Sequence, residues 1–93
     1  MLSIAFCDDE PIMLEELFNV VKGYIDSKKV EFTADLFESG EEFVEKGVRC
    51  RKYDIVFLDI EMKEMNGLEA AAWFRKLNEQ SKVIFVYSHV EYT

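Results

Sequence analysis

Three aspartates stand directly after two apolar segments of the chain. Asp8 and Asp9 follow the segment 2–7, and Asp59 follows the segment 53–58. If these segments are neighbouring parallel strands, the carboxylates meet at one end of a sheet and raise one another's pKa unless a cation intervenes. Carboxylate oxygens together with water suit Mg²⁺ better than a transition metal. Because a carboxylate can also attack phosphorus and form an aspartyl phosphate, the three residues predict a magnesium site capable of phosphoryl transfer.

Each aspartate also has a simpler interpretation when it is taken alone. Asp8 and Asp9 stand where a helix begins, so capping and a favourable interaction with the helix N-terminus explain them equally well. Asp59 taken alone is a solvated loop residue. The joint placement of all three at the ends of apolar strands favours the shared site.

A regular alternation of strands and helices positions these aspartates. Apolar or alternating segments predict strands over residues 2–7, 30–37, 53–58 and 82–87. Helical spacing of apolar residues predicts helices over residues 11–27, about 39–47 and 68–77. Such alternation predicts an α/β fold with one open parallel sheet and right-handed crossovers. Ligands of these sheets bind outside the carboxyl ends of the strands, where the aspartates are expected.

The predicted helices carry recognisable end signals. Pro11 suits a first helical turn, which either Asp9 or Glu10 can cap. Residues 39–42, Ser-Gly-Glu-Glu, have the pattern of a capping box, and Asn66 can cap the third helix. The inner face of that third helix is expected to carry Leu68, Ala71, Phe74 and Leu77.

Length and composition restrict the class of protein. The 93 residues allow one domain, and 11 Lys and Arg against 19 Asp and Glu give a net charge of −8. This acidic balance argues against direct nucleic-acid binding. No apolar run approaches the roughly 20 residues that cross a bilayer, so no membrane association is expected. The first residues are not expected to form a signal peptide. Cys7 and Cys50 are therefore read as reduced thiols of a cytoplasmic protein.

Several motifs together resemble the receiver domain of two-component response regulators. Residues 4–11, Ile-Ala-Phe-Cys-Asp-Asp-Glu-Pro, are similar to the opening of that family. Residues 54–62, together with residues 65–71, are similar to the family's phosphorylation loop. With residues 84–86 and 89–92, the resemblance is closest to receivers that precede LytTR-type DNA-binding domains, and it covers the whole chain, 1–93.

The resemblance implies a role for each matching residue. Asp59 would accept a phosphoryl group from a sensor histidine kinase. Asp9 would bind Mg²⁺ directly, Asp8 would bind it directly or through water, and the Glu61 backbone carbonyl would complete the protein's ligands. The implied fold is the flavodoxin-like, doubly wound parallel sheet, with strand order 2-1-3-4-5 in a complete member. The full-length parent would carry an output DNA-binding domain and would regulate transcription.

Two positions depart from the family pattern. Lys63 stands where the family usually has Pro in the phosphorylation loop, so a looser loop is expected. The family also places a Ser or Thr after the fourth strand to hydrogen-bond the phosphoryl oxygens. That position falls on Tyr87, with Ser88 next. Ser88 is the favoured switch hydroxyl because its short side chain reaches a phosphate oxygen more easily, and Tyr87 is the alternative.

The third departure is the end of the chain, which comes before the family's fifth strand, the Lys on that strand and the final helix. We therefore expect an incomplete receiver fold of four strands and three helices, in the order 2-1-3-4. The uncovered fourth strand predicts either a fragment of a longer regulator or a homodimer through this edge. Two other functions remain open: a pseudo-receiver that binds partners without phosphate, and, more remotely, an aspartate-nucleophile phosphatase. The leading hypothesis is a signalling switch and not an enzyme.

Overall fold

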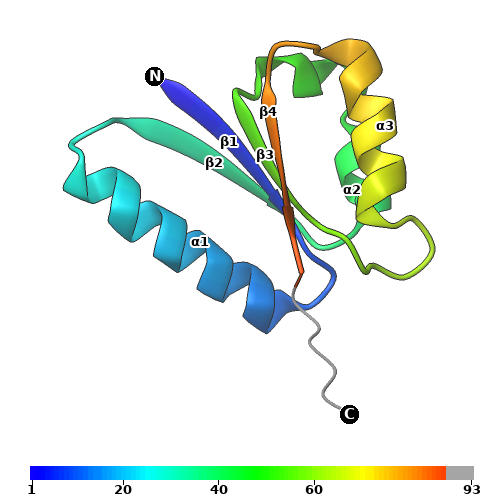
Figure 1. Ribbon diagram of the computed structural model, residues 1–93, viewed down its shortest axis with the longest axis horizontal. Coiled ribbons are helices and arrows are strands. Elements are labelled where there is room, and N and C mark those ends of the chain that lie inside the picture. Colours follow the sequence, from blue (N-terminus) through cyan, green and yellow to red (C-terminus); the bar gives the residue numbers. More distant parts are fainter. Residues whose placement is uncertain (88–93) are drawn as a thin grey trace.

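A four-stranded parallel sheet forms the centre of the protein (Figure 1). A computed structural model describes residues 1–87 of the chain, so Ser88, the favoured switch hydroxyl, lies outside the described residues. The strands are β1 (Leu2–Cys7), β2 (Phe32–Phe37), β3 (Ile55–Asp59) and β4 (Lys82–Val86). Their order is β2-β1-β3-β4, and every neighbouring pair is parallel. The predicted α/β fold and the strand order 2-1-3-4 are confirmed.

Helices cover the two faces of the sheet (Figure 1). Helix α1 (Pro11–Ser27) lies on one face, and α2 (Gly40–Glu45), the 3₁₀ helix η1 (Gly47–Lys52) and α3 (Gly67–Leu77) lie on the other. In β1, Ile4 and Phe6 pack with residues of α1, whereas Ala5 and Cys7 pack with residues of α2 and α3. All four side chains are completely buried. The prediction that the first strand is covered on both faces is confirmed.

The predicted helix caps are at the expected residues, but two of them lack a predicted side-chain bond. Ser39 does accept a hydrogen bond from the Glu42 N–H, but the Glu42 carboxylate accepts from the N–H of Glu38, so no capping box forms. Glu10 is the N-cap of α1 without a side-chain capping bond, and its own N–H donates to Asp8. Asn66 caps α3 in a complete capping box with Glu69, as expected for Asn66.

The inner face of α3 differs from the predicted one at its first residue. Leu68 is 55% exposed, and the buried positions are Gly67, Ala70, Ala71 and Phe74. Gly67 is pressed against the end of β3, and successive helical residues are rotated by about 100°. Leu68 is therefore turned away from the sheet, and Ala70 occupies the inner face in its place.

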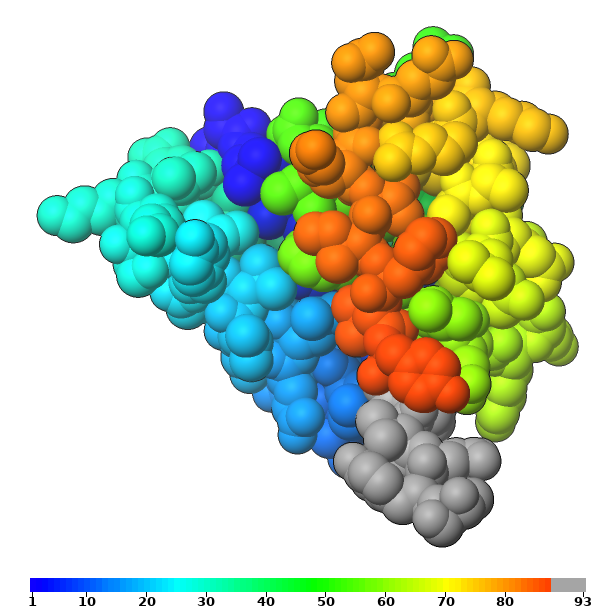
Figure 2. All heavy atoms as spheres, in the orientation of Figure 1, coloured from blue at the N-terminus to red at the C-terminus, as the bar shows by residue number. Residues whose placement is uncertain are grey.

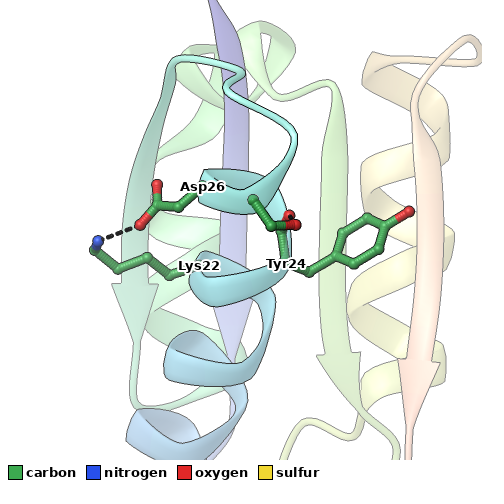
Figure 3. Close-up of polar contacts among 4 residues, drawn as sticks. Lys22, Tyr24 and Asp26 are labelled. Carbon is green, nitrogen blue, oxygen red and sulfur yellow. Dashed lines mark hydrogen bonds and ion pairs between the residues drawn. The ribbon is translucent and has the colours of Figure 1, made fainter.

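One side of helix α1 faces solvent, and another side borders an apolar groove. Lys22 Nζ and Asp26 Oδ2, one turn apart on α1, form an ion pair at 2.6 Å. Figure 3 shows this pair on one side of the helix and Tyr24 pointing to the other side. There Tyr24 lines a groove of about 520 Å³ together with Ile55 and Phe57 of β3. Within residues 1–87, no helix has the length and apolar character needed to cross a membrane.

Strand β4 is an edge of the sheet and is open to view between α1 and α3 in Figure 2. Its Ile84 and Phe85 are each 42% exposed. The predicted apolar edge is therefore present. A homodimer through this edge stays a prediction.

Candidate functional site

Two neighbouring strands bring the three aspartates to one end of the sheet. Strands β1 and β3 pair in parallel with Cys7 opposite Leu58, so the next residues along these two strands are Asp8 and Asp59. One carboxylate oxygen from each of Asp8, Asp9 and Asp59 lies within 4.8 Å of the others. Parallel strands therefore place side chains from distant parts of the chain in one acidic cluster.

The Asp59 carboxylate is buried without a partner. Asp59 is 1% exposed, and neither of its oxygens accepts a hydrogen bond from any of residues 1–87. A buried carboxylate without a hydrogen bond or counter-charge is costly, which implies that a positive group completes the site. The three carboxylates are close enough together to bind one cation, and both oxygens of Asp59 are free to do so. Such a set of oxygen ligands fits a hard divalent cation such as Mg²⁺.

Asp8 has a strongly perturbed acidity. Burial, the charges of Asp59 and Asp9 and the side-chain interaction with Asp59 together raise the pKa of Asp8 from 3.8 to about 6, and burial is the largest cause. A hydrogen bond of 2.9 Å from the Glu10 N–H to Asp8 Oδ1 opposes this shift because it stabilises the anion. The crowded negative charge is thus only partly compensated by the protein itself.

Asp9 joins the loop after β1 to the loop after β3. Its Oδ2 accepts a hydrogen bond of 2.9 Å from the backbone N–H of Lys63. Lys63 stands where the family resemblance leads one to expect Pro, and Pro has no N–H to donate. Lys63 thus supplies a donor that ties the loop to Asp9. The looser loop stays a prediction.

The two remaining described residues of the predicted site contact each other. The Tyr87 hydroxyl donates a hydrogen bond of 2.9 Å to Glu61 Oε1, and both side chains are exposed. This bond raises the pKa of Tyr87 above its ordinary value because it favours the protonated hydroxyl. The Glu61 side chain is therefore directed to Tyr87, which leaves its backbone carbonyl as the predicted metal ligand.

Gly67 contributes to the site in a way that the sequence analysis did not identify. A Cβ at this position would press on the carbonyl oxygen of Asp59 and lie 2.9 Å from its carbonyl carbon. Glycine thus lets the start of α3 approach the end of β3 closely. The Asn66-Gly67 pair in the sequence indicates a turn. It does not indicate that the backbone of Asp59 packs against Gly67.

Replacing Gly67 by Ala is expected to lower the free energy of unfolding by about 1–3 kcal/mol, because the added methyl group must displace the backbone of Asp59. Urea denaturation of the purified protein measures this change. Gly23→Ala is the matched control, since nothing lies within 4 Å of a Cβ there. In the middle of α1 this control is expected to stabilise by about 0.5–1 kcal/mol. Equal effects of the two substitutions would refute the close approach at Gly67.

Comparisons with known proteins agree with this geometry. The model of the family described as response regulator receiver domain matches residues 4–93. The chain is 30% identical to the transcriptional regulatory protein LytR of Staphylococcus aureus, over 91% of this chain and 32% of LytR. It is also 30% identical to the accessory gene regulator protein A of the same organism, over 99% of this chain and 40% of that protein.

A solved structure gives the same result. One chain in the crystal structure of histidine kinase ThkA in complex with response regulator protein TrrA is 32% identical, with a TM-score of 0.67. The match covers 99% of this chain and 73% of that chain. The chain spans about a third of the length of LytR.

Proposed function

Since the chain belongs to the response regulator receiver domain family, we propose that it is a phosphorylation-controlled switch in which Asp59 accepts the phosphoryl group. The observation that carries this proposal is the Asp59 carboxylate, which is buried beside Asp8 and Asp9 and has no hydrogen-bond partner among the described residues. A structural carboxylate at such a depth would be paired. An unpaired one is available as a nucleophile.

Mg²⁺ is the proposed cofactor. Asp9 and Asp59 would hold it directly, Asp8 would do so directly or through water, and the backbone carbonyl of Glu61 would complete the set. When bound, the ion neutralises negative charge on the transferring group. The fit rests on the three converging carboxylates.

The proposed reaction transfers one phosphoryl group. A carboxylate oxygen of Asp59 forms a bond to phosphorus, while the N–P bond of a phosphohistidine breaks and its imidazole nitrogen leaves with the electron pair. The proposed donor is a sensor histidine kinase, and the similarity to a chain crystallised in the ThkA–TrrA complex supports this choice. In this role the chain is a phosphoacceptor and not an enzyme with a separate substrate.

Tyr87 and Ser88 share the proposed switch region. Because the Tyr87 hydroxyl is occupied by Glu61, Ser88 remains the proposed donor to the phosphoryl oxygens, with Tyr87 as the alternative. The absence of Ser or Thr at position 87 also favours the second candidate function, a pseudo-receiver that binds partners without phosphate. Phosphoryl uptake distinguishes the two functions.

The proposed output is transcription. LytR is a transcriptional regulatory protein, and the chain matches only about a third of it. We propose that phosphorylation shifts an equilibrium between two conformations of the loops after β3 and β4, to which an output DNA-binding domain of the full-length parent responds.

The proposed function predicts uptake of one phosphoryl group that depends on a divalent cation. We expect incubation with acetyl phosphate and Mg²⁺ to add the mass of one phosphoryl group, as measured by intact-protein mass spectrometry. Excess EDTA should reduce the uptake at least about tenfold, because the acidic cluster then repels the anionic donor. If neither this chain nor its full-length parent takes up a phosphoryl group in the presence of Mg²⁺, the pseudo-receiver function is favoured instead.

A further inference from the structure

A second pocket borders the acidic cluster at one lining residue, Phe37, whose carbonyl accepts a hydrogen bond of 3.1 Å from the Asp8 N–H. It is a hollow of about 470 Å³ between the edge strand β2, the end of α2 and η1, and it shares no residue with the aspartate site. Helix η1 leads into the beginning of β3, at the end of the sheet opposite to Asp59 (Figure 1). The η1 residues that line the pocket therefore lie away from the aspartates. Its volume is in the range of pockets that hold small molecules.

Positive charge is concentrated along one side of this pocket. Residues 46–52 contain four of the 11 Lys and Arg and no acid, although the chain as a whole has a net charge of −8. A 3₁₀ helix has about three residues per turn, so side chains three positions apart lie in one row. Lys46, Arg49 and Lys52 form such a row, and all three line the pocket. Arg51 is out of phase with this row and does not line the pocket.

The inner wall of the pocket is formed by polar side chains that bond to one another. Tyr53 is 2% exposed, and its hydroxyl donates a hydrogen bond of 2.6 Å to Asp35 Oδ2. Lys52 Nζ lies 3.2 Å from the same oxygen. Both contacts lower the pKa of Asp35 because they stabilise its anion. The charge of Lys52 is therefore balanced within the wall.

Two cations of the row remain available to a ligand. Among residues 1–87, neither Lys46 nor Arg49 has an ion pair or a side-chain hydrogen bond. Two acids of α2, Glu42 and Glu45, also line the pocket, and the Glu42 carboxylate is held by the N–H of Glu38. A phosphate group would therefore bind on the η1 side of the pocket, away from these acids. The side formed by η1 thus presents one guanidinium and one ammonium group beside a polar, buried wall.

We propose that this pocket binds a small molecule through its phosphate group, with Arg49 and Lys46 as the binding residues. A guanidinium matches two phosphate oxygens with parallel hydrogen bonds, and an ammonium adds a second charge. A phosphate monoester carries a charge of about −1.5 to −2 at pH 7, which the two unpaired cations balance. A ligand with a single carboxylate would balance the charge of only one of these two cations.

Calorimetric titration with inorganic pyrophosphate tests this site, in EDTA and at constant ionic strength so that no divalent ion bridges the probe to the aspartates. We expect saturable binding of one equivalent. Arg49→Gln and Lys46→Gln should each weaken this binding about tenfold or more. Arg51→Gln is the matched control, because it removes the same charge two residues along the same helix, and it should change the affinity less than twofold.

Three results would overturn the proposal. Equal weakening by Arg49→Gln and Arg51→Gln would show a diffuse attraction to the basic segment and not a pocket. Tighter binding of citrate than of pyrophosphate would exclude a phosphate preference. Binding of an acidic peptide without any binding of pyrophosphate would make the pocket part of a protein interface. Because all three side chains are exposed, unchanged thermal unfolding of the variants is expected and would confirm that each is folded.

Discussion

Asp59→Asn is expected to abolish phosphoryl uptake from acetyl phosphate, to less than about one hundredth of the wild-type extent. The amide that replaces the carboxylate has nearly the same shape but cannot act as the nucleophile. Intact-protein mass spectrometry after incubation with Mg²⁺ measures the extent. The expectation depends on the placement of Asp59, which is buried at the end of β3 with both oxygens free of hydrogen bonds from residues 1–87.

Asp54→Asn is the matched control for this experiment. Asp54 lies just before the beginning of β3, and its Oδ2 accepts a hydrogen bond of 2.8 Å from the Ser3 N–H. Asn retains an oxygen that can accept this bond, so the fold and the phosphoryl uptake should both be preserved. Uptake that persists in Asp59→Asn would place the phosphoryl group on another residue and would refute the proposed acceptor.

Asp8→Asn is expected to raise the free energy of unfolding of the metal-free protein at pH 7.5 by about 2 kcal/mol. The substitution removes a negative charge that burial and the neighbouring aspartates destabilise. It retains an oxygen that can accept the hydrogen bond from the Glu10 N–H. Urea denaturation in EDTA at several pH values measures the difference between wild type and variant.

The sign of the pH dependence follows from the raised pKa of Asp8, which is 3.8 ordinarily and about 6 in the folded protein. Between these values the folded state binds more protons than the unfolded state, so the stability of the wild type falls as the pH rises. The penalty is complete above about pH 6 and vanishes below about pH 4. The advantage of Asp8→Asn should therefore be large at pH 7.5 and close to zero at pH 4. An advantage of the same size at both pH values would contradict this origin.

Mg²⁺ is expected to reduce the stability advantage of Asp8→Asn. A ligand that binds only the folded state stabilises it by an amount that grows with its concentration. Millimolar Mg²⁺ should therefore stabilise the wild type at pH 7.5 more than it stabilises Asp8→Asn. The smaller gain of the variant separates the loss of a metal ligand from the simple relief of charge repulsion.

The secondary structure and the acidic cluster could be predicted because both depend on simple regularities. Apolar runs covered on both faces indicate parallel strands, and the carboxyl ends of neighbouring parallel strands meet at one edge of the sheet. Asp8, Asp9 and Asp59 stand directly after two such runs, and the structure places them within reach of one cation. Their position needed only the order of the strands, which the family resemblance supplied.

Helix orientation and loop contacts could not be predicted in the same way. Periodicity shows that α3 has an apolar face, but Leu68 and Ala70 fit that pattern about equally well. The close approach of Gly67 to Asp59 decides between them. The 3₁₀ helix over Gly47–Lys52, and with it the row of cations, also lay beyond the predicted end of α2.

The sequence by itself determined which carboxylates gather at the end of the sheet, because that follows from the order of residues along each strand. Only the tertiary structure decided how they are held. The bond from the Lys63 N–H to Asp9 joins residues 54 positions apart, and the Tyr87–Glu61 bond joins two loops. Such contacts depend on the rotation and spacing of packed elements, to which every residue of the core contributes and which no local pattern specifies.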